Sequence, residues 1–433
     1  MSASSPVAAE VSPPRAGRHW STWAVLALAV LIRGGAFNLR ADTLQSDPDG
    51  YRALARNLLS DGVFGSDERP TAYRPPLYPL LLAPCMALED QGFSFFAIRL
   101  LHVASGVGTV MAVLWLGGRW RLGGWSLLAA ILVVCDPILI NQSLLVMTET
   151  LAACLAALAL VALAWADERP SPLRAVLAGC CLGLAALCRP TFLPWAVLVV
   201  IAEVWRWPTR ACKAKCGGAL LVALMLTLAP WAVRNQLQIG RPVITTTHGG
   251  YTLLLGNNQS YYVFLKTAER GQVWSSTALD DEMARQDFPT LGDLIINSEL
   301  SGDQRDYKIA LNAIRQQPGM FLYASLVRVS RLWGLLPQKV NAPGVTRSET
   351  LRYSTVVWYL AEFALAAVGL GVLGKQLFHS PWLWGMLLAL TFTAVHAVYW
   401  SDMRMRAPLM PFVALLAARG AGAIGGRIAQ RKA

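Results

Sequence analysis

The stretch SDPDGYRALARNLL (46–59), followed by YRPPLYP (73–79), sets the organisation of this 433-residue chain. Asp47 and Asp49 stand where a long apolar segment has just ended. After them, apolar residues recur at intervals of three and four, at Tyr51, Leu54, Ala55, Leu58 and Leu59. This spacing predicts an amphipathic helix that lies on an apolar surface, and Gly62 is a suitable place for it to end.

The composition indicates a membrane protein. The chain is 55% hydrophobic and only 15% charged, with a mean hydropathy of +0.43, which is too apolar for an ordinary soluble domain. Its formal net charge of +12 would suggest nucleic acid in a soluble protein, but here Lys and Arg cluster in short loops between apolar runs. Membrane orientation and anionic lipid headgroups explain this distribution better, so no nucleic-acid partner is expected.

The eight cysteines show no pattern typical of a disulfide framework. Five of them lie in or beside apolar segments and are interpreted as buried free thiols: Cys135, Cys154, Cys180, Cys181 and Cys188. Cys212 and Cys216 are four residues apart in CKAKC, without a histidine or a second pair nearby. This spacing argues against a zinc site.

Apolar runs of about 20 residues, the length that spans a bilayer, predict about ten transmembrane helices. Residues 1–19 are interpreted as a polar cytoplasmic leader, and residues 20–433 as one polytopic domain that begins with an uncleaved anchor. The expected spans are 20–39, 96–116, 125–140, 144–166, one ending at 188–195, one ending at 205–215, 217–233, 354–373, 382–400 and 408–424. Successive loops lie on alternate sides of the membrane, and the loops richest in Lys and Arg all fall on the same side. This distribution places both termini in the cytoplasm.

Two longer polar segments, 40–95 and 234–353, are expected outside the cell. The first contains the acids and the amphipathic helix. In the second, HGGYTLLLGNN (248–258) is interpreted as strand-like or turn-rich because glycines punctuate it, and a helix is expected over 302–317.

The run 318–337 has spanning length but contains Arg328 and Arg331. Arginines inside a bilayer are energetically expensive. We therefore expect this run to lie at the membrane interface. That choice also leaves the basic C-terminal tail on the cytoplasmic side.

Asp47, Asp49 and Glu149 are the candidate catalytic acids. Helix capping alone could explain Asp47, because Asp is a good N-cap and Pro is favoured at the next position. It explains less well a second acid two residues later. Glu149 stands at the outer mouth of the fourth span, where an ionisable group is a functional candidate, although a helix-start acid is the alternative.

Arg74 is the first candidate for binding a phosphate. Pro75 and Pro76 stiffen the backbone that follows it, so its guanidinium is held in place. A guanidinium matches phosphate geometry with two parallel hydrogen bonds. The alternative is an arginine that extends to the lipid headgroups.

The segment SDMRMRAPLMP (401–411) places Arg404 and Arg406 on the same predicted outer face. The positive-inside tendency disfavours two arginines there. A ligand phosphate would account for them, although Asp402 could pair with one. His248 is a further candidate, although a loop histidine is more often structural.

These motifs, together with LLVMTETL, CRPTFLPW, APWAVRNQLQIGRPV and RMRAPLMPF, resemble the bacterial integral-membrane glycosyltransferases of the GT-C class. The resemblance is to the family 39-like group of protein O-mannosyltransferases and lipid A aminoarabinose transferases. It implies an all-α membrane protein, a polytopic GT-C-like bundle of about ten transmembrane helices with extracytoplasmic juxtamembrane helices. It also implies a bacterial plasma-membrane location with the active site outside.

The resemblance implies transfer of a hexosyl or pentosyl group from a polyprenyl-phosphate donor, usually with inversion. In such families an Asp followed four residues later by an aromatic serves the acceptor or acts as base, which selects Asp47 with Tyr51. A basic residue before Pro-Pro-Leu contacts the donor phosphate, which selects Arg74. A further basic residue of these families falls on Gly50 here, so Arg52 is the expected substitute.

The chemistry agrees with these assignments, since an acceptor hydroxyl needs a base and a departing phosphate needs fixed positive charge. Arginines supply that charge without a metal, so no cofactor is expected to be required, although Asp47, Asp49 and Glu149 could converge on a divalent cation. Tyr78 and His248 join Tyr51 as expected substrate-binding residues. The expected partners are the donor, membrane lipids and an acceptor that is a lipid, a glycan or a protein.

A transporter or flippase of a lipid-linked substrate is the alternative function. It would also explain many spans and intramembrane arginines. It predicts inverted repeats or paired broken helices, however, and the sequence shows no such internal symmetry. A non-catalytic scaffold gives no reason for charges to converge on one face.

Overall fold

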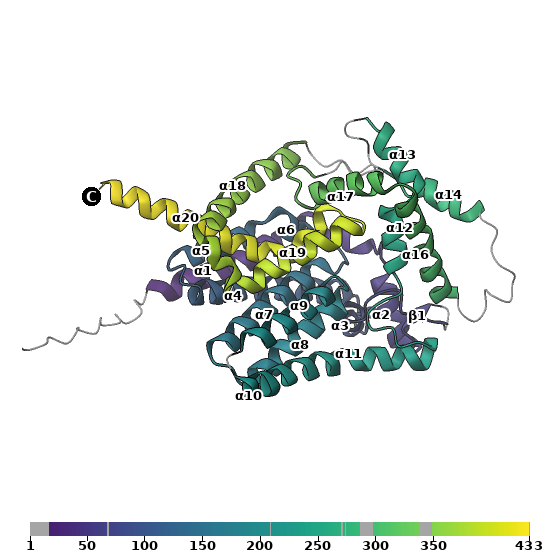
Figure 1. Ribbon diagram of the computed structural model, residues 1–433, viewed down its shortest axis with the longest axis horizontal. Coiled ribbons are helices and arrows are strands. Elements are labelled where there is room, and N and C mark those ends of the chain that lie inside the picture. Colours follow the sequence, from purple (N-terminus) through teal and green to yellow (C-terminus); the bar gives the residue numbers. More distant parts are fainter. Residues whose placement is uncertain are drawn as a thin grey trace, which may run out of the picture.

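The computed structural model describes residues 17–66, 69–207, 209–269, 272, 274–285, 298–337 and 349–432. Most of the predicted leader, 1–19, and parts of the predicted segment 234–353 lie outside these residues. The described chain is almost entirely helical (Figure 1). Its one described sheet is an antiparallel pair of two-residue strands, β1 (Gly65–Ser66) and β2 (Arg69–Pro70).

The predicted membrane bundle is confirmed. Among the described residues, six helical segments are long and apolar enough to cross a membrane. They lie in α1 (Gly17–Leu39), α4 (Ser94–Arg119), α7 (Glu149–Glu168), α10 (Arg210–Cys212) through α11 (Gly218–Ile239), α18 (Glu349–Leu373) with η3 (Gly374–Phe378), and η4 (Met403–Leu409) with α20 (Met410–Lys432). A bent pair adds a seventh segment, α5 (Trp125–Cys135) with α6 (Pro137–Ser143). With the shorter helices α8 (Pro172–Cys188), α9 (Phe192–Arg206) and α19 (Trp382–Val398), the described bundle has about ten members.

The bend of 48° between α5 and α6 occurs at Asp136-Pro137, where the sequence places the exit of the third span. Proline ends α5 because it has no amide hydrogen to donate. The Asp136 carboxylate accepts a hydrogen bond from the amide of Leu139 (2.7 Å), and the Tyr359 hydroxyl accepts one from the amide of Ile138 (3.1 Å). These bonds satisfy backbone groups that a lipid environment would leave unpaired.

Small residues allow the helices of the bundle to pack closely. α7 is rich in alanine and is buried along most of its length. Where α18 crosses α20, Gly369 faces the carbonyl of Leu416 and Gly420 faces the carbonyl of Leu365, and a Cβ at either position would collide with that carbonyl. Close backbone contact of this kind is the usual way in which helices associate in lipid.

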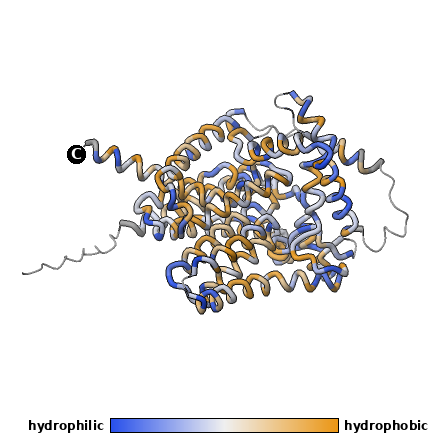
Figure 2. Tube along the Cα trace, viewed as in Figure 1, coloured by the Kyte–Doolittle hydropathy of each residue, from blue (hydrophilic) through white to orange (hydrophobic). Residues whose placement is uncertain are grey.

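Short helices cover one end of the bundle, which we call the α2 end (Figure 1). These helices are α2 (Tyr51–Ser60), α3 (Leu77–Met86), α12 (Gly249–Gly256), α13 (Gln259–Thr267), α14 (Thr277–Arg285), α16 (Ser298–Gln316) and α17 (Pro318–Leu332). Figure 2 shows hydrophilic residues along α16, next to a largely hydrophobic bundle. α1 begins and α20 ends at the opposite end, which we call the terminal end. Which end faces the cytoplasm stays a prediction from loop charge.

The predicted amphipathic helix is confirmed as α2, whose Tyr51, Leu54 and Ala55 are buried. The interpretation of 248–258 as strand-like or turn-rich is wrong, because most of this run forms α12. Its glycines serve a helix contact instead of turns. A Cβ on Gly250 would collide with the carbonyl of Asp303 on α16, so glycine allows the two helices to touch.

The run expected to lie at the interface forms α17, which is not among the candidate spans of the described chain. Arg328 is fully buried, and its Nε donates to the carbonyl of Ala397 (2.9 Å). Its NH1 donates to the carbonyl of Gly256. Arg328 therefore joins α17 to α12 and α19.

We expect Arg328→Met to lower the free energy of unfolding by about 3 kcal/mol, because it leaves two buried carbonyls without their charged donor. The measurement is the midpoint of thermal unfolding of the purified protein in detergent. Arg315→Met, on an exposed position of α16, is the matched control and should leave the midpoint nearly unchanged. Equal midpoints for the two variants would contradict the role of Arg328.

Candidate active site

Asp47 is positioned by the start of α2. Its Oδ2 accepts hydrogen bonds from the amides of Arg52 (2.9 Å) and Ala53 (3.1 Å). The helix begins at Tyr51 and its N-cap position is Gly50, whose φ of 71° favours glycine, so Asp47 caps from outside the helix and Pro48 is not its first residue. Asp47 Oδ1 is buried without a hydrogen-bond partner. The carboxylate is thus held rigidly with one oxygen free.

Asp49 forms an ion pair with Arg74. Arg74 NH2 lies 3.0 Å from Asp49 Oδ1, and its Nε donates to the Asp49 carbonyl at the same distance. The guanidinium also lies over the rings of Tyr73 (5.2 Å) and Tyr51 (5.7 Å). The predicted fixed arginine therefore faces one of the two predicted acids, and Asp49 has less freedom to act as a base than Asp47.

Hydrogen bonds from distant segments hold residues 71–73, which precede Arg74. Glu299 on α16 accepts hydrogen bonds from the Thr71 hydroxyl and the amide of Ala72 (2.9 Å). Arg234 on α11 donates to the carbonyl of Thr71 (2.7 Å), and the Thr246 hydroxyl donates to the carbonyl of Tyr73 (2.6 Å). The place of Arg74 therefore depends on α11 and α16 as well as on its two prolines.

Glu149 forms a second charged group with two arginines. Its side chain is almost fully buried at the start of α7, and its Oε1 lies 3.0 Å from Arg189 NH1 and 3.6 Å from Arg404 NH1. Its Oε2 has no hydrogen-bond partner. Sequence reasoning did not select Arg189, although it precedes Pro190 at the end of an apolar helix, as Arg74 precedes Pro75. The repeated Arg-Pro pair is the sequence feature that could have identified Arg189 as a site residue.

Tyr51 stands between the two charged groups. Burial raises the pKa of its phenol, Asp49 and Glu149 raise it further, and Arg74 and Arg189 oppose them. The Tyr51 ring meets Tyr78 edge-on at 5.2 Å. The Tyr78 hydroxyl forms a hydrogen bond with His102 Nε2 (2.8 Å), and the Tyr78 side chain is fully buried. Tyr78 therefore packs against Tyr51 from inside the bundle.

His248 lies beside the Arg74 segment. Its ring centroid is 4.3 Å from that of Tyr73 and 5.3 Å from that of Tyr251. Burial, with a smaller contribution from Arg74, lowers the pKa of His248 to about 3. The ring is therefore neutral near pH 7 and offers hydrogen bonds but no positive charge to a ligand.

Two other arginines that were predicted to contact the phosphate donate hydrogen bonds to the protein backbone. Arg52 donates to the carbonyls of Leu44 and Gln45, both at 2.9 Å. Arg406 is fully buried, donates to the carbonyl of Leu332 (3.0 Å), and lies 4.1 Å from the centre of the Tyr359 ring. Both arginines therefore join backbone segments in this structure.

The three predicted acids do not come together as metal ligands. Among the described residues, no group of three or more His, Cys, Asp or Glu side chains is arranged to hold a metal ion. Asp49 and Glu149 each face arginine instead. The arrangement brings free carboxylate oxygens and three guanidiniums to the α2 end.

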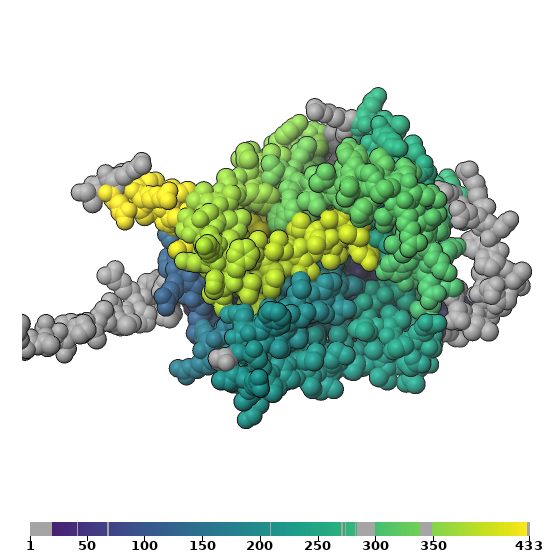
Figure 3. Space-filling model, viewed as in Figure 1, coloured from purple at the N-terminus to yellow at the C-terminus, as the bar shows by residue number. Residues whose placement is uncertain are grey.

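In Figure 3 a hollow between the yellow C-terminal helices and the teal helices shows part of the dark purple N-terminal portion at its bottom.

Residues 73–233 match the family model described as dolichyl-phosphate-mannose-protein mannosyltransferase. The matched segment contains Arg74, Glu149 and Arg189. Comparison with curated protein sequences gives no match.

Solved structures with the same fold include two of the oligosaccharyltransferase of Archaeoglobus fulgidus. AglB in complex with an inhibitory peptide and a dolichol-phosphate has a TM-score of 0.54 at 13% identity, covering 96% of this chain and 52% of that chain. The complex with Zn and sulfate has a TM-score of 0.51 at 15% identity, covering 94% and 50%. ArnT from Cupriavidus metallidurans bound to undecaprenyl phosphate has a TM-score of 0.45 at 16% identity, covering 95% and 79%.

This chain spans about half the length of the oligosaccharyltransferase structures. At such identities the likeness concerns the fold. The shared fold and the matched segment agree with the resemblance seen in the sequence. The chain is a multi-span membrane protein with a GT-C-like fold.

Proposed function

We propose that this protein transfers a sugar from a polyprenyl-phosphate donor to an acceptor at the α2 end of the bundle, with inversion at the anomeric carbon. The observation that carries the proposal is the arrangement of charge at this end. Three arginines from separate segments, Arg74, Arg189 and Arg404, pair with Asp49 and Glu149, and the start of α2 holds Asp47 with an unpartnered Oδ1. A base and fixed positive charge are what such a transfer needs.

The comparisons support the kind of donor. The matched family is described by a dolichyl-phosphate-linked sugar, and AglB was solved with dolichol-phosphate. Both are polyprenyl-type phosphates. We extend this chemistry to the present chain, with a hexosyl or pentosyl group as the sugar and a lipid, a glycan or a protein as the acceptor. The α2 end would face outward across the bacterial plasma membrane.

The contacts of the arginines favour binding of a phosphate. Arg189 NH2 lies 2.7 Å from Met405 Sδ, and Arg404 NH1 lies 2.9 Å from Met147 Sδ. A thioether is a weak acceptor, so these donors have no strong partner in that direction. Phosphate oxygens would be better partners. The Arg404 side chain is 31% exposed, the most accessible of the three.

In the proposed step, the acceptor hydroxyl attacks the anomeric carbon of the donor while Asp47 Oδ1 takes its proton. The bond between that carbon and the phosphate oxygen breaks, and the electron pair leaves with the polyprenyl phosphate. The arginines stabilise the negative charge that develops on the departing phosphate. Attack opposite to the leaving group inverts the anomeric configuration.

Asp47→Asn is expected to fold and to bind donor, because Asn caps a helix about as well as Asp. It should lose on the order of a hundredfold or more in turnover, because the amide cannot take the proton. Asp49→Asn should lose much less, since Asp49 is already paired with Arg74. The measurement is sugar transfer from a synthetic polyprenyl-phosphate sugar by the purified protein.

Other outcomes of that assay would assign the catalytic base to a different residue. An active Asp47→Asn with an inactive Asp49→Asn would move the base by two residues. If both stay active, Glu149, with its free Oε2, is the next candidate. Donor binding without turnover of any sugar donor in the wild type would favour a transporter or flippase.

Arg74→Ala and Arg404→Ala are each expected to weaken donor binding on the order of tenfold, because each removes a charged donor from the phosphate. Arg56→Ala is the matched control, since Arg56 belongs to the same outer segment but pairs with Glu89 on an exposed surface (2.6 Å). Binding of a fluorescent polyprenyl phosphate is the readout. Affinities equal to that of the control would remove both arginines from the donor site.

A further inference from the structure

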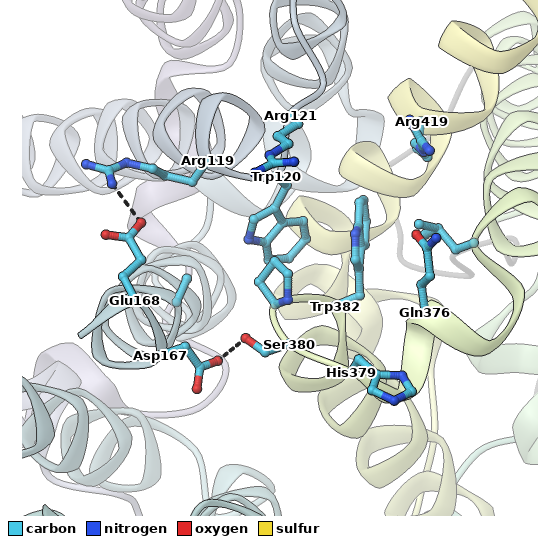
Figure 4. Close-up of a pocket in the computed structure, with 13 residues that line it drawn as sticks. Arg119, Trp120, Arg121, Asp167, Glu168, Gln376, His379, Ser380, Trp382 and Arg419 are labelled. Carbon is cyan, nitrogen blue, oxygen red and sulfur yellow. Dashed lines mark hydrogen bonds and ion pairs between the residues drawn. The ribbon is translucent and has the colours of Figure 1, made fainter. Parts of the chain in front are cut away.

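A cleft of about 570 Å³ opens at the terminal end of the bundle, away from the candidate active site. It lies between the end of α4, the end of α7, the turn from η3 to α19, and α20 (Figure 4). The cleft therefore lies between the N-terminal and the C-terminal helices of the bundle. No step of the proposed transfer uses it.

The acids that line the cleft are already compensated. Glu168 pairs with Arg119 at 2.7 Å. Asp167 faces Arg206 at 3.5 Å and accepts a hydrogen bond from the indole of Trp384 (2.6 Å). The negative charge of the cleft is thus balanced by neighbouring arginines.

Two lining arginines are not compensated. Among the described residues, neither Arg121 nor Arg419 has an ion-pair partner, and Arg419 Nε is buried without a hydrogen bond. Arg121 has a φ of 58°, which is uncommon for a residue with a side chain, and lies in the turn that ends α4. The cleft therefore carries an excess of positive charge.

A buried donor is also without a partner in the cleft. Trp120 is only 6% exposed, and its indole Nε1 has no hydrogen-bond acceptor. Its ring lies 4.4 Å from that of Trp382. In Figure 4 Trp120 and Arg121 lie on one side of the cleft, Trp382 in the middle and Arg419 on the other side. A buried donor that lacks an acceptor costs free energy, which a bound acceptor would recover.

The surroundings place the cleft at the level of lipid headgroups. Large aromatic side chains are exposed at the same end of the bundle, namely Trp125 (41%), Trp205 (81%) and Phe378 (64%). Aromatic side chains gather at the interface between membrane and water. A ligand at this depth is either part of a lipid or a solute that enters from the aqueous side.

We infer that this cleft binds a phosphate ester between Arg121 and Arg419, with Trp120 Nε1 as a third donor. Guanidiniums are well suited to phosphate oxygens. The ester is the headgroup of an anionic phospholipid or a small soluble phosphate. In either case it joins the α4–α5 turn to α20, so it should stabilise the bundle.

The test uses the full-length protein in detergent, with three probes that share a glycerol unit. Dioleoylphosphatidylglycerol presents the phosphate on a lipid, dioleoylglycerol is the same lipid without phosphate, and sn-glycerol 3-phosphate is the soluble form. Binding is followed by native mass spectrometry and by the midpoint of thermal unfolding. We expect retention of phosphatidylglycerol and a raised midpoint, with no effect of dioleoylglycerol.

The variant Arg121→Gln with Arg419→Gln should bind phosphatidylglycerol far more weakly, on the order of tenfold for each arginine lost. The matched control is Arg169→Gln with Arg427→Gln, which removes the same charge from two exposed positions of the same end. It should bind like the wild type. If the double variant does not fold, each single variant is measured instead.

The outcomes distinguish a lipid phosphate from a soluble phosphate, and both from attraction to general surface charge. Cleft-dependent binding of sn-glycerol 3-phosphate that equals binding of the lipid identifies a soluble phosphate as the ligand. Equal binding by the cleft variant and the control variant would overturn the inference, since it would show that only general surface charge holds the lipid. Sugar transfer is not part of the readout, so failure here leaves the proposed function untouched.

Discussion

The ion group around Glu149 is the interaction on which the α2 end depends. A single buried carboxylate lies between Arg189 and Arg404, which come from the end of α8 and from η4. Removing one partner from such a group leaves an uncompensated charge in a medium of low dielectric constant, which costs several kcal/mol. The three segments are therefore fixed relative to one another at the place where the proposed donor phosphate binds.

Arginine has three different roles in this chain. Arg328 and Arg406 donate to backbone carbonyls and hold helices together inside the protein. Arg74 faces an acid at the α2 end and, with Arg189 and Arg404, supplies positive charge to the proposed donor site. Arg121 and Arg419 have neither kind of partner among the described residues. Only their surroundings, and not the residue type, distinguish these roles.

The sequence by itself determined what depends on neighbouring residues. Hydrophobic runs marked the membrane helices, because the length of a span is set by the thickness of the bilayer. The spacing from Tyr51 to Leu59 marked α2, because an apolar stripe follows the period of the helix. The cost of a charge in lipid separated α17 from the spans. The residues around Asp47 and Arg74 were found for the same local reasons.

The tertiary structure decided which charges meet. Whether Arg406 faces a ligand or a carbonyl depends on where α17 ends, and its spacing from Arg404 carries no information on that. Arg189 joined the site because α8 packs beside α7. Gly250 of α12 proved to serve a contact with Asp303 of α16, 53 residues away. Local periodicity fixes which face of a helix is apolar, whereas ion pairs and close backbone contacts depend on how distant helices pack.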